Sequence, residues 1–312
     1  MSALICGSVA YDTIMVFKDR FKNHILPDKV HMLSVSFLVP DMRREFGGCA
    51  GNIAYNLKLL GGDPLPMATV GKDFGPYGDW MDRHGIARRH ISMIEAEFTA
   101  QAFITTDLDD NQITAFHPGA MSYAHLNGVG DADGVRIGMV SPDGRDGMVQ
   151  HAAQFAEAGI PFVFDPGQGL PMFDGDDLVR FIDQASWVTV NAYEWEMLSE
   201  RTGLGIAEVA AQVKALVITH GARGSEVHTR GRRIEIPPAK PSEVADPTGC
   251  GDAYRAGLLY GLEHGMDWET TGRMASLLGA IKVARSGTQN HRFDRDEFAD
   301  RFAEAFGRSI GW

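Results

Sequence analysis

The residue types best suited to chemistry gather in one glycine-rich stretch, Asp246–Asp252 (Asp-Pro-Thr-Gly-Cys-Gly-Asp). An apolar-rich run follows at once, which indicates that a buried helix begins here. Unpaired backbone N–H groups and the helix dipole favour an anion at such a start, and Gly249 and Gly251, on either side of Cys250, lack a Cβ and would let it approach closely. Asp252 would repel a phosphate there unless it had a task, such as taking a proton from an attacking hydroxyl. The alternative is a carboxylate that only caps the helix.

A second glycine-rich stretch, Gly47–Asn52 (Gly-Gly-Cys-Ala-Gly-Asn), lies far upstream. The two stretches together resemble the signatures of the ribokinase-like PfkB family of sugar and nucleoside kinases, a glycine pair followed by an asparagine and, later, D-T-T-G-A-G-D-x-F. Both occur here in the family's order, and the resemblance covers essentially the whole chain. It implies an ATP-dependent phosphotransferase in which Asp252 is the catalytic base and residues 249–251 form the anion hole.

Several earlier residues are expected to hold the acceptor. The apolar run 3–6 predicts a buried strand that opens into a loop carrying Ser8 and Asp12. Loops at the carboxyl ends of strands are where α/β sheets bind ligands. In the resembling family an Asp at this place accepts hydrogen bonds from two neighbouring sugar hydroxyls, and residues matching Gly48 and Asn52 face the same sugar. The alternatives are a turn aspartate and an asparagine that only caps its helix.

The resemblance also places the phosphoryl donor and its metal. Asn191 and Glu194 stand in N-A-Y-E, which resembles the family's N-x-x-E motif. There the Glu, mainly through water, helps to organise Mg²⁺ on the phosphates, and one carboxylate suffices because Mg²⁺ keeps several waters. The alternative is an acid that complements the helix dipole. Thr219, Gly221 and Gly224 resemble the T-x-G-x-x-G loop that passes under ATP.

The acceptor is expected to be a nucleoside. Residues 34–39 with Phe37, and residues 115–119 with Phe116, are candidates to form a slot for the base, because an aromatic ring stacks on a base. Ser36 and Gln168 are further candidates to contact the acceptor there. Ala102 and Gly169 stand where related adenosine kinases carry an aromatic residue and a Gln, so the slot should be wider and less selective. The expected reaction transfers the γ-phosphoryl group of ATP to the 5′-hydroxyl of adenosine, and also of inosine and pyrimidine nucleosides. The alternatives are a ribokinase-type sugar kinase and a non-catalytic nucleotide-binding regulator.

Strand-like and helical patterns alternate along the chain that must position these residues. Apolar strand-like runs occur at 65–70, 135–140, 160–164, 187–190 and 216–219, and helical patterns at 53–60, 147–158, 193–201, 268–284 and 293–306. This alternation predicts an α/β fold, a doubly wound and mainly parallel sheet with helices on both faces. In the resembling family a monovalent cation such as K⁺ is often bound near residues 286–288.

Two segments, at about 13–46 and 97–118, interrupt the alternation with strand-like patterns at 32–39, 98–106 and 112–116. They resemble the family's small β-sheet lid, which covers the acceptor and excludes water so that ATP is not hydrolysed. The exposed face of such a sheet commonly packs against its twin, so a homodimer through the lid is consistent with the resemblance. We interpret residues 1–312 as one kinase domain with this lid.

The amino-acid composition limits the classes of partner that we expect for this protein. The chain has 312 residues, 44% of them hydrophobic and 22% charged, which is typical of a protein with a sizeable core. Its formal net charge of -12 disfavours nucleic-acid binding, which needs clustered basic residues. Cys6, Cys49 and Cys250 fit neither a disulfide framework nor a zinc site. Reduced thiols, no signal-peptide pattern and no membrane-spanning run lead us to expect a cytoplasmic protein without membrane contact.

Overall fold

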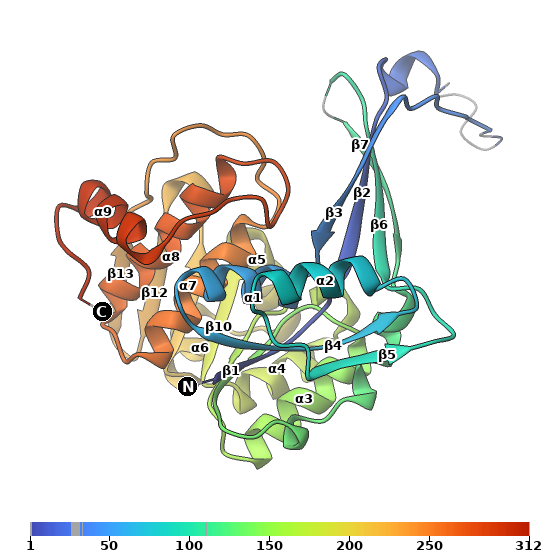
Figure 1. The fold of residues 1–312 in the computed structure, drawn as a ribbon. Helices are drawn as coiled ribbons and strands as arrows, with labels where there is room; N and C mark the ends of the chain where they lie inside the picture. The colour runs from blue at the N-terminus through green and yellow to red at the C-terminus, as the bar shows by residue number, and fades with distance from the viewer. Residues whose placement is uncertain (1, 26–31, 33, 110, 312) are drawn as a thin grey trace.

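The computed structural model describes residues 2–25, 32, 34–109 and 111–311, and its main element is a twisted sheet of nine described strands (Figure 1). The order across the sheet is β13-β12-β11-β10-β9-β8-β1-β4-β5, and all neighbours from β11 to β5 are parallel. Only β12 and β13 run antiparallel to their neighbours. The strands are β1 (Ser2–Cys6), β4 (Asp63–Gly71), β5 (His90–Ile94), β8 (Val135–Val140), β9 (Phe162–Phe164), β10 (Trp187–Asn191), β11 (Ala215–Thr219), β12 (Ser225–Thr229) and β13 (Arg232–Ile236).

Helices cover both faces of this sheet, because successive strand side chains point to opposite sides. In β1, Ala3 and Ile5 belong to one apolar core and Leu4 and Cys6 to the other. The first core includes residues of α1 (Cys49–Leu59), α2 (Gly75–Arg83), α7 (Cys250–Glu263), α8 (Trp268–Val283) and α9 (Arg295–Phe306). The second includes residues of α3 (Arg145–Glu157), α4 (Gly175–Gln184), α5 (Ala192–Thr202) and α6 (Ile206–Gln212). The predicted doubly wound, mainly parallel α/β fold is confirmed.

A second, four-stranded sheet projects from the main body (Figure 1). Its order is β3-β2-β6-β7, made of β2 (Ala10–Val16), β3 (Asp41–Gly47), β6 (Ala100–Thr106) and β7 (Gln112–His117). The register aligns Glu45, Asp12, Ala102 and Phe116 in one row across the four strands. Residues directly opposite each other share a face, so these four side chains lie on the same side of the small sheet.

The first half of the small sheet differs from the sequence expectation. Residues 34–40 form no strand, whereas β3 begins after Pro40, at Asp41. The alternating pattern has another cause: the Phe37 ring packs against Phe17 and Phe21, with centroids 4.8 and 5.0 Å apart. Asp12, expected in a loop, lies inside β2. Residues 26–31 and 33 of the predicted lid segment lie outside the described residues.

Short 3₁₀ helices complete the fold: η1 (Phe21–Asn23), η3 (Gly119–Leu126), η4 (Val129–Asp131), η5 (Gly167–Met172) and η6 (Gly221–Arg223). Within the described part of the chain, no helix is long and apolar enough to cross a membrane. Two of these helices, η5 and η6, follow the carboxyl ends of β9 and β11 and therefore stand at the edge where α/β sheets bind ligands.

Candidate active site

The start of α7 is built by glycine geometry. Gly249 is the N-cap residue, with φ of 77°, a backbone conformation that favours glycine. A Cβ at this position would lie 3.0 Å from Thr288 Cγ2. The helix begins at Cys250, whose amide donates to Pro247 O at 3.2 Å, and Asp252 lies in its first turn. The helix start expected from the sequence is therefore present, with its dipole directed at the region in front of Gly249.

Asp252 contacts a second predicted residue. Asn52 Nδ2 donates a hydrogen bond of 2.8 Å to Asp252 Oδ2. Burial raises the pKa of the Asp252 carboxyl to about 7, and the Asn52 hydrogen bond and the Arg255 charge oppose this rise. A carboxyl that titrates near neutrality is suited to accept and release a proton under physiological conditions.

A buried ion pair anchors α7 to the edge of the main sheet. Arg255, one turn after Gly251, donates from Nε at 3.0 Å and from Nη2 at 2.8 Å to Asp165 Oδ1. Its Nη2 also lies 3.7 Å from Glu194 Oε2. Asp165 follows β9 directly and accepts a 3.2 Å hydrogen bond from Ser141, which follows β8. Neither Arg255 nor Asp165 was predicted to belong to the site; an arginine inside an apolar helical run was the one signal of their pairing.

Three of the expected acceptor residues surround the start of α1. Gly48 is its N-cap, with φ of 84°, and a Cβ there would lie 2.6 Å from both Ala10 N and Ser8 O. Ser8 Oγ accepts a hydrogen bond of 3.1 Å from the Cys49 amide. Asn52 does not cap α1, so the capping alternative was wrong, and its side chain instead reaches Asp252.

Asp12 lies in the row of side chains that crosses the small sheet. Burial raises the pKa of its carboxyl to about 6, with further contributions from the charges of Glu45 and Asp246. Ala102 stands beside it on β6, and Phe116 stands next on β7 with 52% of its surface exposed. The row therefore places a carboxylate and an aromatic ring on one face, separated by the short Ala102 side chain.

Two expected base-slot residues have different surroundings. Gln168 is exposed on η5, next to buried Gly169, where a Cβ would lie 3.3 Å from Met148 Sδ and from Met172 Cε. Ser36 is exposed and adjoins the Phe37 cluster beyond the far end of β2. Asp12 lies four residues before that end of β2, which at about 3.3 Å per residue is about 13 Å. The structure therefore separates Ser36 from the site.

The expected donor residues come together on adjacent strands. Asn191 ends β10 and Thr219 ends β11, and the two are partners in the parallel register. Gly221 begins η6, which follows β11, and Gly224 comes directly after it. A hydrogen bond of 2.7 Å between Tyr254 Oη and Ser225 Oγ ties α7 to β12, beside β11.

Glu194 takes part in a capping box at the start of α5. Its Oε2 accepts a 2.7 Å hydrogen bond from the Asn191 backbone N–H, and its Oε1 a 2.7 Å bond from Asn191 Nδ2. The helix-start role weighed in the sequence analysis is therefore present. Each carboxylate oxygen keeps a second lone pair, which suits contact with the waters of a hydrated Mg²⁺. Among the described residues, no three His, Cys, Asp or Glu side chains form a metal-binding group, so an all-protein cage is not available.

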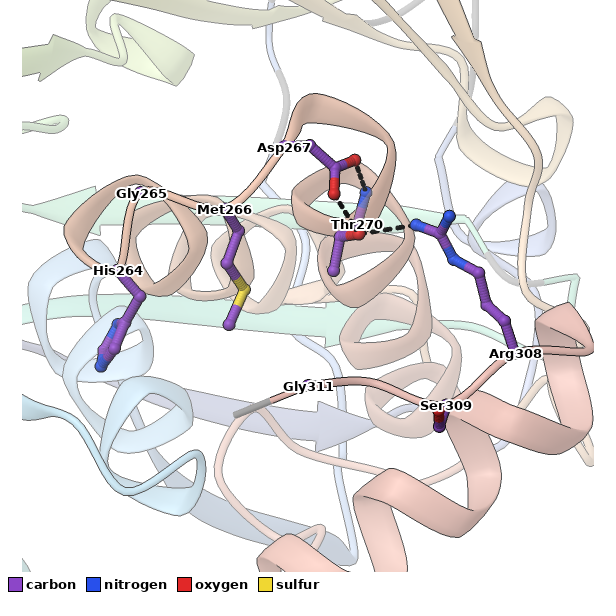
Figure 2. A pocket seen from close by; sticks show the side chains of 8 residues that line it. All are labelled: His264, Gly265, Met266, Asp267, Thr270, Arg308, Ser309 and Gly311. Atoms are coloured by element: carbon purple, nitrogen blue, oxygen red, sulfur yellow. Dashed lines mark hydrogen bonds between the residues drawn. The ribbon is translucent and has the colours of Figure 1, made fainter.

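An open hollow elsewhere on the surface does not carry this chemistry. It has a volume of about 590 Å³ and lies at the opposite end of α7 from Asp252 (Figure 2). Its polar groups bind one another: Asp267 Oδ1 accepts from the Thr270 amide at 2.9 Å, and Arg308 Nη2 donates to Thr270 Oγ1 at 2.6 Å. We therefore place the candidate active site at the start of α7.

Known proteins are similar to this chain in sequence and in fold. The model of the pfkB family of carbohydrate kinases matches residues 9–294. A nucleoside kinase of Methanocaldococcus jannaschii is 32% identical over 272 residues, 86% of this chain and 89% of that protein. The structure of Burkholderia thailandensis nucleoside kinase with inosine superposes with a TM-score of 0.90 at 52% identity, covering 98% of this chain and 99% of that one. Its complex with ADP-inosine gives a TM-score of 0.88 at 54% identity, covering 98% and 97%.

These matches extend over nearly the whole chain and include the glycine-built start of α7 with its carboxylate. The chain belongs to the pfkB family of carbohydrate kinases, and it is a phosphotransferase with a ribokinase-like fold.

Proposed function

We propose that this protein is an ATP-dependent nucleoside kinase in which Asp252 takes the proton from the 5′-hydroxyl of the acceptor. One observation carries the proposal: a carboxyl with a pKa of about 7 lies in the first turn of a glycine-started helix, 2.8 Å from the Asn52 amide. The similarity to nucleoside kinases of an archaeon and of a bacterium supports it. The attacking oxygen then bonds to the γ-phosphorus, ADP leaves, and Asp252 holds the released proton.

The donor half of the site is proposed from charge and position. Asn191, Thr219, Gly221 and Gly224 stand at the ends of β10 and β11 and would hold ATP. The amides of Gly249 and Gly251 would face its transferred phosphoryl group, where the helix dipole favours negative charge, whereas the amide of Cys250, the third predicted member of the anion hole, already donates to Pro247 O. Mg²⁺ bound with ATP would neutralise phosphate charge, and Glu194 would accept hydrogen bonds from its waters. A relative's structure with ADP-inosine supports this pairing of nucleotide and nucleoside.

A nucleoside fits the acceptor side better than a free sugar does. The Asp12 row continues past the sugar-binding carboxylate to the exposed Phe116 ring, a surface that a free sugar would leave unused. Stacking on an aromatic ring is worth about 1–3 kcal/mol per base. A sugar kinase remains the alternative function. A non-catalytic regulator is not supported, because the chain belongs to a kinase family and has a carboxyl whose pKa lies near neutrality at the start of α7.

The small sheet is proposed as a lid that also joins two subunits. Met42, Phe103 and Ile113 lie on the face opposite Asp12 and expose 71%, 40% and 44% of their surfaces. Exposed apolar side chains of this size mark interaction surfaces. We expect a dimeric mass by light scattering, and Phe103→Glu should shift the protein towards the monomer. A native protein that is monomeric at all concentrations would contradict the proposal.

Replacing the base tests the proposed chemistry directly. Asp252→Asn keeps the shape but cannot take the proton, so kcat should fall by about 10²–10⁴-fold while nucleoside binding persists. The native enzyme should lose activity as the pH falls through about 7, because the base must be ionised and its pKa is raised to about 7. Asp296→Asn removes an exposed carboxylate of α9 and serves as the control. Near-native turnover of Asp252→Asn would exclude this residue as the base.

Sugar recognition is tested at Asp12. A buried polar group left without its hydrogen-bond partner costs about 1–3 kcal/mol, and Asp12→Ala would leave the two sugar hydroxyls in that state. Asp12→Ala should therefore weaken nucleoside binding by about one to two orders of magnitude, measured by calorimetry, and a 2′-deoxynucleoside should be a poor acceptor of the native enzyme. Asp41→Ala is the control: Asp41 begins β3, opposite the end of β2 that lies away from Asp12, and this variant should bind the nucleoside normally. Equal catalytic efficiency with adenosine and deoxyadenosine would rule out the diol contact.

The breadth of specificity for the nucleoside base is tested at Ala102. With Ala102 and Gly169 short, the base is held mainly by stacking, which hardly distinguishes bases. Adenosine, inosine, cytidine and uridine should therefore differ in catalytic efficiency by only about 10–200-fold. Ala102→Phe should fill the space beside Phe116 and change this ranking, whereas Ala102→Ser adds one hydroxyl and should not. A native enzyme that used adenosine alone would contradict the wide slot.

A further inference from the structure

A chain of three side-chain hydrogen bonds runs from α2 to the catalytic carboxylate. Trp80 Nε1 donates to Gln289 Oε1 at 2.9 Å, and Gln289 Nε2 donates to Asn52 Oδ1 at 3.0 Å. Asn52 Nδ2 then donates to Asp252 Oδ2 at 2.8 Å. Gln289 is only 2% exposed and Asn52 only 4% exposed, so water does not provide either amide with other partners.

The direction of this chain is fixed by the chemistry of its first member. An indole N–H only donates, so the oxygen of Gln289 must face Trp80. The Gln289 NH₂ group must then face Asn52, and the Asn52 oxygen must face Gln289. Gln289 Nε2 also donates to Tyr77 Oη at 2.6 Å, whose hydroxyl donates to Gly47 O at 2.8 Å, so that branch has the same polarity. The Asn52 NH₂ group is left facing Asp252.

We propose that Trp80 and Gln289 are positioning residues that lock the Asn52 amide with its NH₂ group towards Asp252. This inference rests on the proposed role of Asp252 as the base. A locked amide can only donate, and a donor favours the ionised carboxylate. A free amide could turn over and accept a hydrogen bond from the protonated carboxyl as well. The lock thus removes a contact that would stabilise the inactive, protonated base.

Other groups facing Asp252 stay unchanged when the lock is removed. Burial is the main cause that raises its pKa, and the Asn52 hydrogen bond opposes it. The titratable and charged groups around it come from α1, α2, α7, α8 and the loop after β9, namely Cys49, Tyr77, Cys250, Arg255, Lys282 and Asp165. The two substitutions that disturb the lock, Gln289→Met and Trp80→Phe, neither add nor remove a charge. Any displacement of the pH profile therefore reports a change in the orientation of the Asn52 amide.

The test follows kcat/KM between about pH 5 and 9, because this ratio reports the pKa of the base in the free enzyme. Gln289→Met keeps the length of the side chain but not its hydrogen-bonding groups. It should move the acid limb of the pH profile up by about one pH unit, so that kcat/KM at pH values below the limb falls about tenfold. Trp80→Phe should move the limb in the same direction by less. Because Trp80 acts through Gln289, the double variant should match Gln289→Met alone.

Tyr55→Phe is the matched control. It removes another buried hydrogen bond, 2.6 Å from Tyr55 Oη to His291 O, which also joins α1 to the segment after α8. It should lower stability without moving the acid limb. If Gln289→Met does not fold, Trp80→Phe alone must still raise the limb for the proposal to stand.

The outcomes separate this inference from the proposed function. An acid limb that stays in place in the folded Gln289→Met and Trp80→Phe variants, while Asp252→Asn is inactive, would overturn the lock and leave the base assignment intact. Near-native activity of Asp252→Asn would instead remove the base assignment and this inference with it. A limb that rises equally in Tyr55→Phe would also overturn the lock, because loosened packing alone would then explain the change.

Discussion

The burial of carboxylates under the start of α7 is the constraint on which the site depends. Desolvation disfavours the charged form of each, so every one needs a partner that offsets it. In the part of the chain that the structure describes, one guanidinium is buried, that of Arg255, and its shortest contacts are with Asp165. Asp252 receives a neutral amide donor and the helix N-terminus instead. Burial without a direct ion pair raises the pKa of the Asp252 carboxyl to about 7.

The parallel sheet explains why donor and acceptor residues meet at α7. Strands β1, β8, β9, β10 and β11 are neighbours with their carboxyl ends at one edge. The residues proposed to bind the acceptor follow β1, and those proposed to bind the donor follow β10 and β11 at the other side. Arg255 reaches Asp165, at the end of the intervening β9, so the start of α7 stands between the two groups. Sheet order, and not sequence proximity, sets the direction from donor to acceptor.

The features that could be predicted from the sequence are those set by the local backbone, namely the glycine-marked helix starts and the buried strands. Gly48 and Gly249 have positive φ and backbone or side-chain atoms where a Cβ would stand, so glycine marks both helix starts directly. The buried strands of the main sheet are short apolar runs, and those were predicted to within a few residues. The small sheet carries a weaker pattern because its strands are exposed, and alternation near Phe37 belonged to an aromatic cluster.

Residues that act through distant partners could not be predicted. Arg255 pairs with Asp165 across 90 positions, and Gln289 contacts Asn52 across 237. A lone arginine or glutamine has no local signature for such a contact. Asn52 was found because it follows a glycine pair, yet its contact with Asp252, 200 positions away, was not. Local reading therefore identifies residues that shape the backbone, and tertiary packing is needed to identify those that orient them.

Recognition and chemistry rest on different elements that meet at Asn52. The register of the small sheet sets the row from Asp12 to Phe116, and a slip of one residue would turn all of it to the other face. The position of Asp252 is set instead by the packing of α7 on α1 and on the main sheet. Side chains in the row can therefore change size without moving the carboxylate. Asn52, which donates a hydrogen bond to Asp252 and is proposed to contact the acceptor, is the residue at which a change in recognition would reach the chemistry.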